Sequence, residues 1–228
     1  MYRYTSIDRV TQMIDQKALT LVSPRKWHDP YEEWWCDQLF APGSQLATAH
    51  AFGSCWTVSY LDEPRWRLYA CICDEEQEPL PAVRIATTVG KLVDALVWSP
   101  GIDTSKAYIG RVRYPKRSAE LTRIAVRLRD GGHPQIANSA ANALYTKRYA
   151  YRFEDEVRVL WIDRSKRRDL HEIPIQPMSF IDQVMIGPTK SEAHVAAIAG
   201  KLLDRGFPSD RIRESGLYRR PRELPPEP

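Results

Sequence analysis

Hydrophobic residues recur along the chain at two spacings, which predict an alternation of short strands and helices. The clearest helix lies near the C-terminus, where a capping box of Thr189 and Glu192 precedes an apolar stripe and Gly206 ends the helix. Helical spacing and start signals also predict helices over residues 7–14, after Pro30, and over 64–73, 89–97, 121–128 and 136–147. Short β-type runs predict strands over residues 2–5, 18–22, 52–60, 82–86, 107–114, 156–162 and 179–186. This mixed order is typical of an α+β fold.

Two helix starts can be placed from capping residues. Thr5 is expected to cap the first helix, because a threonine oxygen there accepts a free backbone N–H. Asp29 is well placed as the cap of the next helix, with Pro30 at its first position. Capping alone explains this turn, so we assign Asp29 a structural role.

Length and composition indicate one globular unit. The 228 residues are 43% hydrophobic and 27% charged, which is enough to bury a substantial core. We predict a single α+β domain over residues 1–216 and a Pro/Arg-rich tail over residues 217–228. No apolar run approaches the roughly 18 residues of a membrane span, and the N-terminus lacks the pattern of a signal peptide. The expected location is therefore cytoplasmic, with no membrane partner.

The cysteines and histidines do not form a metal-binding pattern. Cys71 and Cys73 are one residue apart, which is not the usual zinc spacing, and the five histidines are scattered. Disulfides are not expected in a reducing compartment. We therefore expect no metal cofactor.

Positive charge is concentrated in runs, although the net charge is only +4. The longest run consists of Arg111, Arg113, Lys116, Arg117, Arg123, Arg127 and Arg129. Such a run can bind the phosphates of a nucleic acid or an acidic protein partner. It can equally be a solvated face that is balanced by acids elsewhere.

Three charged residues are spaced two apart around the predicted strand 156–162. Glu154, Glu156 and Arg158 would therefore share one strand face, with Val157, Val159 and Trp161 on the other. A cross-strand ladder of salt bridges would explain this row. A cleft lined by two carboxylates would explain it equally well.

Several short motifs along the chain, taken in order, resemble the family called domain of unknown function 2971. They are Tyr2-Arg3-Tyr4-Thr5, Leu21-Val22-Ser23-Pro24, Trp27-His28-Asp29-Pro30-Tyr31-Glu32, Cys55-Trp56-Thr57, Trp66-Arg67-Leu68-Tyr69-Ala70, Phe153-Glu154-Asp155-Glu156-Val157-Arg158 and Val184-Met185-Ile186-Gly187-Pro188. The chain departs from that family at His28, where asparagine is usual.

A second, weaker resemblance is to ADP-ribosyltransferases. Arg3-x-Thr5 is similar to the Arg or His start of those enzymes, and Glu154-x-Glu156 is similar to their catalytic glutamate motif. The strand between them carries Ser54, Thr57 and Ser59, where those enzymes place a serine or tyrosine motif. The resemblance implies a central mixed or antiparallel split sheet flanked by helices, with NAD as substrate. The role would be that of a transferase or NAD glycohydrolase, as a toxin or a phage-defence effector.

The resemblance also implies roles for individual residues. Glu156 would stabilise the cation that develops on the ribose, and Glu154 would orient or deprotonate the acceptor. The NAD-binding residues would be Arg3, Thr5, Thr57 and Tyr69. Arg3 could instead pair with an acid at the strand edge, and Tyr69 could be a core residue.

This hypothesis requires Arg3 and Glu156 to face one cleft, so the strand face with Glu156 should be partly open.

Two other functions remain open. A non-catalytic module would bind nucleic acid or protein through its basic face. A metal-dependent nuclease would bind magnesium through Asp29, Glu32, Glu154 and Glu156.

Overall fold

The structure is a computed structural model of the chain. It describes residues 1–27, 29–40, 49–59, 63–70, 82–129, 136–163, 169–189 and 191–217. The predicted tail falls outside these residues from position 218 onward, as do Cys71 and Cys73.

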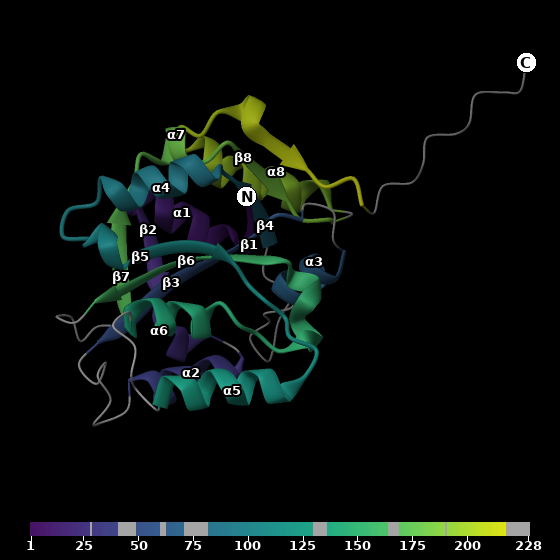
Figure 1. Ribbon diagram of the computed structural model, residues 1–228. Helices are drawn as coiled ribbons and strands as arrows, with labels where there is room; N and C mark the ends of the chain where they lie inside the picture. Colours follow the sequence, from purple (N-terminus) through teal and green to yellow (C-terminus); the bar gives the residue numbers. More distant parts are fainter. Residues whose placement is uncertain are drawn as a thin grey trace, which may run out of the picture.

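The centre of the fold is an open, mixed β-sheet in an α+β arrangement (Figure 1). Its strands are β1 (Tyr2–Ser6), β2 (Ala18–Val22), β3 (His50–Thr57), β4 (Ala82–Ala86), β5 (Ala107–Arg111), β6 (Glu156–Asp163), β7 (Leu170–Pro174), β8 (Gln183–Ile186) and β9 (Ile212–Glu214). The main path runs in the order β5-β6-β3-β1-β4-β8-β9. These pairs are antiparallel except β8 with β9, which is parallel.

The sheet splits at β3. One edge of β3 pairs with β6 along its whole length. The other edge is shared by two strands, since Tyr2 of β1 pairs with Thr57, and Val22 of β2 pairs with Gly53. β2 then pairs with β7, which leads away from the main path. The branch places the first strand of the chain and the late strand β6 on either side of β3.

Helices cover both faces of the sheet. The α-helices are α1 (Ile7–Gln16), α2 (Pro30–Leu39), α3 (Glu63–Ala70), α4 (Val89–Val97), α5 (Ser118–Arg129), α6 (Ile136–Leu144), α7 (Pro177–Phe180) and α8 (Glu192–Leu203). The 3-10 turns are η1 (Pro24–Lys26), η2 (Thr104–Lys106), η3 (Tyr149–Glu154) and η4 (Ser209–Arg211). Helices α2, α5 and α6 lie below the sheet in Figure 1, and α1, α4, α7 and α8 lie above it.

Two hydrophobic cores follow from this layering. The larger core joins α1, α4, α7 and α8 to one face of the central strands, where Phe52, Trp56, Val159 and Trp161 are buried. The smaller core joins α2 and α6 to the other face, through side chains such as Leu160. Strands β3 and β6 are therefore buried on both faces, and burial includes polar and charged members such as Thr57, Glu156 and Arg158.

Local capping explains where the early helices begin. Asp29 caps α2 as predicted, since its carboxylate accepts the Tyr31 N–H at 3.1 Å. The predicted cap of α1 is wrong by one position. Thr5 belongs to β1, and the Ser6 hydroxyl accepts the Arg9 N–H instead. The Thr189 capping box is also wrong, because the cap of α8 is Ser191.

The structure differs from the predicted elements in three further places. The strand expected over 179–186 is instead α7 followed by β8, because Pro177 favours the start of a helical turn. The short strands β7 and β9 were not predicted. Glu154 lies in η3 rather than next to a continuous strand, because Asp155 adopts a left-handed conformation (φ 38°) that separates η3 from β6.

None of the helices among the described residues is long and apolar enough to cross a membrane.

Candidate functional site: a buried cluster of carboxylates and cations

The site begins on the β6 face that meets α2 and α6. Glu156 and Arg158 are two residues apart on β6, so they point the same way, and their β3 partners are Thr57 and Cys55. The Arg158 guanidinium donates to the Glu156 carboxylate at 2.8 Å and to the carbonyl of Leu144. Both side chains are almost fully buried.

Helix α2 supplies the second carboxylate. Its start is set by Asp29 and Pro30, and this start places Glu32 on the inner side of the first turn. Glu32 forms an ion pair with Arg158, 126 positions later in the chain. The Trp27 ring lies over the same guanidinium, 4.5 Å from its centroid. The turn before α2 and the strand β6 therefore meet at Arg158.

The segment between α6 and β6 supplies the remaining charges. Lys147 donates to Glu154 at 2.7 Å and lies 3.8 Å from Glu32 and 3.9 Å from Glu156. The five residues Glu32, Lys147, Glu154, Glu156 and Arg158 form what we call the charge cluster. Three carboxyl groups share two cations, so one negative charge is in excess when all are ionised. Only Glu154 has a side chain with appreciable solvent contact, at 16% exposure.

This imbalance moves the carboxyl pKa values in different directions. For Glu156, burial raises the pKa, but the attraction of Arg158 and Lys147 outweighs burial and lowers it below the ordinary value. For Glu154, burial raises the pKa, and Lys147 offsets only part of that rise. Two carboxyls with opposite shifts are suited to separate acid and base roles.

The other members follow the same physics. Burial raises the pKa of Glu32 more than Arg158 and Lys147 lower it. Burial alone would lower the pKa of Lys147, but the attraction of Glu156, Glu32 and Glu154 raises it, so this ammonium stays charged. Burial raises the pKa of the Cys55 thiol well above its ordinary value, so Cys55 is not a nucleophile near neutral pH.

An aromatic rim borders the cluster at its exposed end. Arg148 pairs with Asp29 at 2.6 Å and donates to the Tyr151 hydroxyl at 3.0 Å. Its guanidinium lies 4.6 Å from the centroid of Tyr31. The Lys147 ammonium lies 4.6 Å from the ring of Tyr151. Aromatic rings and cations therefore lie next to Lys147, the ion-pair partner of Glu154.

The structure separates the predicted NAD-binding residues. Tyr2 pairs with Thr57, and Thr57 pairs with Glu156, so these three share one face of the sheet. Arg3 is one position further and lies on the opposite face, where its guanidinium donates to Ser54 at 3.0 Å. The prediction that Arg3 and Glu156 face one cleft is wrong. The alternation of side chains along a strand is the reason, and it places Thr5 with Arg3.

The expectation of an open strand face is also wrong. Trp27, Glu32 and the end of α6 cover Glu156 and Arg158, whereas the opposite face with Val157, Val159 and Trp161 is buried as predicted. Thr57 is buried, and its hydroxyl accepts from Arg65 and donates to the Asp155 carbonyl at 3.3 Å. The Tyr69 side chain lies outside the described residues.

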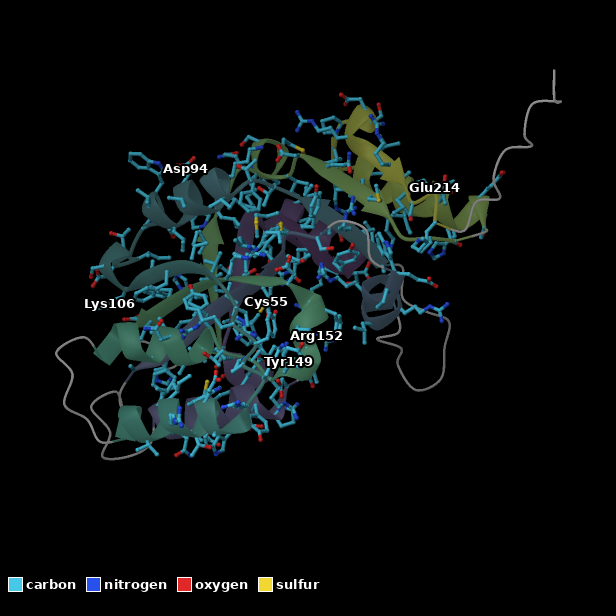
Figure 2. The ribbon with its side chains drawn as sticks, turned by 45° about the vertical axis from the view of Figure 1, so that its right-hand side comes forward. Cys55, Asp94, Lys106, Tyr149, Arg152 and Glu214 are labelled. Atoms are coloured by element: carbon cyan, nitrogen blue, oxygen red, sulfur yellow. The ribbon has the colours of Figure 1, made fainter. Side chains whose placement is uncertain are left out.

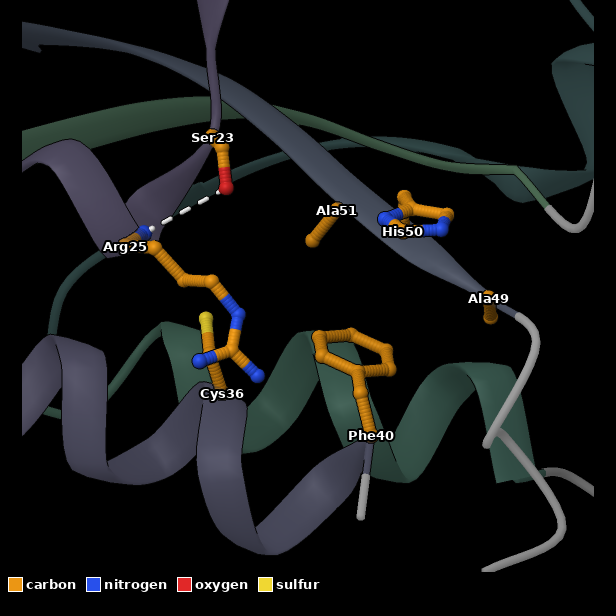
Figure 3. A pocket seen from close by; sticks show the side chains of 7 residues that line it. All are labelled: Ser23, Arg25, Cys36, Phe40, Ala49, His50 and Ala51. Carbon is orange, nitrogen blue, oxygen red and sulfur yellow. Dashed lines mark hydrogen bonds between the residues drawn. The ribbon is translucent and has the colours of Figure 1, made fainter. Parts of the chain in front are cut away.

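A small cavity lies elsewhere, between the start of β3 and the end of α2 (Figure 3). It has a volume of about 80 Å³ and is lined by Ser23, Arg25, Cys36, Phe40, Ala49, His50 and Ala51. Ligand sites usually enclose about 300–1,000 Å³, so this cavity is too small for a nucleotide.

Among the described residues, no group of three or more His, Cys, Asp or Glu side chains is placed to hold a metal ion. The cluster carboxylates contact an ammonium or a guanidinium instead.

The sequence analysis missed Lys147, Arg148 and Tyr151 as members of the site. A signal was present, because cations and aromatics alternate through the run Lys-Arg-Tyr-Ala-Tyr-Arg at 147–152. Figure 2 shows Tyr149 and Arg152 on this segment and Cys55 further inside, on the sheet.

None of the comparisons with family models, curated proteins and solved structures gives a match for this chain.

Proposed function

We propose that the chain is an NAD-consuming ADP-ribosyltransferase or NAD glycohydrolase whose reactive carboxylate is Glu154. The observation that carries the proposal is the charge cluster, in which Glu154 and Glu156 have opposite pKa shifts and only Glu154 reaches solvent. Carboxyl pairs of this kind act on glycosidic bonds, including the bond between nicotinamide and ribose.

Two further features support the proposal. The motifs 27–32 and 153–158, which carry the resemblance to the family called domain of unknown function 2971, meet at the ion pair between Glu32 and Arg158. The strand order places β1 and β6 on either side of β3 in a split sheet, which agrees with the expected ADP-ribosyltransferase-like architecture. The Arg3–Ser54 hydrogen bond resembles the pairing of an arginine strand with a serine strand, but it lies on the other face from Glu156.

The chemistry assigns each residue a task. When the nicotinamide leaves with the bonding electrons, positive charge develops on the ribose, and an ionised Glu154 next to it would stabilise that charge. Lys147 holds Glu154 in place, and Glu156 and Arg158 act as positioning residues beneath it. Arg148 could contact the pyrophosphate, and Tyr151 could stack on a flat ring. A lone pair of water or of an acceptor then forms the new bond to the ribose carbon, and the proton that the nucleophile loses passes to solvent water.

The test is the release of nicotinamide from NAD by the purified protein, with and without cell lysate as a source of acceptor. Wild type is expected to release nicotinamide, and Glu154→Gln should be slower by roughly 100-fold or more, as when one preorganised electrostatic group is lost. Glu172→Gln on β7 is the matched control, since Glu172 is exposed and distant, and it should keep full activity. No nicotinamide from wild type, or equal rates for wild type and Glu154→Gln, would refute the proposal.

The contacts of the described residues bear differently on the nuclease hypothesis and on the binding-module hypothesis. The nuclease hypothesis needs carboxylates free for magnesium, whereas Glu32, Glu154 and Glu156 are bonded to cations. The binding-module hypothesis is favoured by one specific feature, the exposed aromatic and cationic surface of η3.

A further inference from the structure

The segment η3 carries two ridges of side chains. A 3-10 helix has three residues per turn, so residues three apart lie directly above one another. One ridge, formed by Arg148, Tyr151 and Glu154, leads into the charge cluster. The second ridge, formed by Tyr149 and Arg152, points to solvent. The second ridge has no part in the proposed function.

Two cations lie over the ring of Tyr149, one from η3 and one from the segment between β5 and α5. The Arg152 guanidinium lies 4.5 Å from the Tyr149 centroid, and the Lys116 ammonium lies 5.8 Å from the same ring. Tyr149 is 36% exposed and Phe153, next in line, is 42% exposed. Within the part of the chain that the structure describes, neither Lys116 nor Arg152 forms an ion pair. Their charges are therefore available to a ligand.

The first ridge, through Arg148, borders an aromatic group on α2. Tyr31 is 40% exposed and Trp34 is 38% exposed, and their rings lie 6.0 Å apart. Arg148 links this pair to η3, because its guanidinium is 4.6 Å from Tyr31 and 5.1 Å from Tyr151. Exposed rings with cations beside them therefore occur both on η3, at Tyr149, and on α2, at Tyr31 and Trp34. We call the surface formed by Tyr149, Lys116, Arg152, Tyr31 and Trp34 the stacking surface.

We propose that the stacking surface binds single-stranded nucleic acid. Unpaired bases stack on aromatic faces whatever their sequence, and cations between the rings bind the phosphates. A duplex keeps its bases inside and offers only phosphates, and an acidic peptide has no comparable set of flat rings. The binding needs neither NAD nor the carboxylates of the cluster, so its failure and that of the proposed activity are separate results.

The experiment measures the fluorescence anisotropy of labelled 20-nucleotide dT and rU strands with the full chain, in the absence of NAD. Tyr149→Leu is expected to weaken binding about tenfold, because one base–aromatic stack is worth about 1–3 kcal/mol. Tyr149→Phe keeps the ring and should bind like wild type. The double variant Lys116→Gln/Arg152→Gln should reduce the slope of log affinity against log salt by about 1.4, since each phosphate contact on a single strand contributes about 0.7.

Controls separate this surface from general basicity and from folding. Arg213→Gln removes an exposed arginine on β9, at the opposite edge of the sheet, and should bind like wild type. Melting temperatures show whether each variant is folded. Four outcomes would overturn the proposal: no binding of either strand at low salt, equal loss with Arg213→Gln, no effect of Tyr149→Leu, or tighter binding of a duplex or a polyglutamate peptide than of single strands. The comparison of dT with rU distinguishes DNA from RNA as the source of the strand.

Discussion

Glu154 and Glu156 are two positions apart, yet their surroundings shift their pKa values in opposite directions. Glu156 lies on β6 beside Arg158, which favours its ionised form and lowers its pKa. Glu154 lies on η3, where burial raises its pKa more than the ion pair with Lys147 lowers it. The two carboxyls should therefore affect folding stability with opposite dependence on pH.

Glu156→Gln is expected to destabilise the protein at pH 7. A lowered folded pKa contributes stability above the ordinary value of 4.5, and this stability is lost as pH falls through the folded pKa. The difference between the variant and wild type should therefore stay constant from pH 7 to about 5 and shrink only as the pH falls below 4.5. Each unit of pKa shift corresponds to about 1.4 kcal/mol. Urea unfolding at several pH values measures the difference.

Glu154→Gln should show the reverse. A raised folded pKa means that wild type loses stability as pH rises above 4.5, whereas glutamine does not titrate. The variant should match wild type near pH 4 and equal or exceed it at pH 7. A Glu154→Gln protein that is strongly destabilised at pH 7 but not at pH 4 would show that the ion pair with Lys147 outweighs burial.

At the scale of elements, two glycines differ in how closely other atoms pack against them. Gly53 on β3 lets neighbouring side chains approach the strand, because a Cβ there would lie 2.8 Å from both Leu160 Cδ2 and Trp27 Cζ2. Trp27 in turn lies over Arg158, so Gly53 helps to close the charge cluster. Gly200 in α8 has no atom within 4 Å of such a Cβ.

We therefore expect opposite effects of the same substitution. Gly53→Ala should destabilise the protein by about 1–3 kcal/mol through overpacking. Gly200→Ala should stabilise it by about 0.5–1 kcal/mol, because alanine loses less conformational entropy in a helix. Thermal unfolding of both variants tests this. Equal effects at the two positions would contradict the packing described around Trp27.

At the scale of the molecule, the two cores make the sheet uneven in stability. β3 and β6 are buried on both faces and pair on both edges, whereas β9 has three residues and a single partner, β8. Regions with few buried contacts open before the molecule unfolds globally.

Hydrogen exchange should follow this order. The amides of β3 and β6 are expected to exchange only on global unfolding, and those of β9 by local opening at much lower free energy. Mass spectrometry of exchange at increasing urea gives both values. Exchange of β6 as early as β9 would show that the described packing of Leu160 and Trp161 between two helical layers is wrong.

How much of this could be predicted depends on the range of the interactions. β2, β4 and α4 follow from residues close in sequence, and their predicted bounds are confirmed. The caps of α1 and α8 were each misplaced, because several Ser and Thr residues near a helix start offer the same hydrogen bond. The sequence analysis placed Glu154 on the strand face, because no local pattern predicted the left-handed conformation of Asp155.

By itself, the sequence determined the α+β order, most element positions and the carboxylates of the candidate site. Only the tertiary structure decided which of these residues meet. Successive side chains of a strand point to alternate faces of the sheet. The pairing register therefore places Arg3 on one face and Glu156 on the other, where the two side chains cannot meet. Packing of α2, and of the segment between α6 and η3, against β6 brought Glu32 and Lys147 to Arg158 and Glu156. Those contacts span more than a hundred positions in the case of Glu32 and Arg158, and no local spacing encodes them.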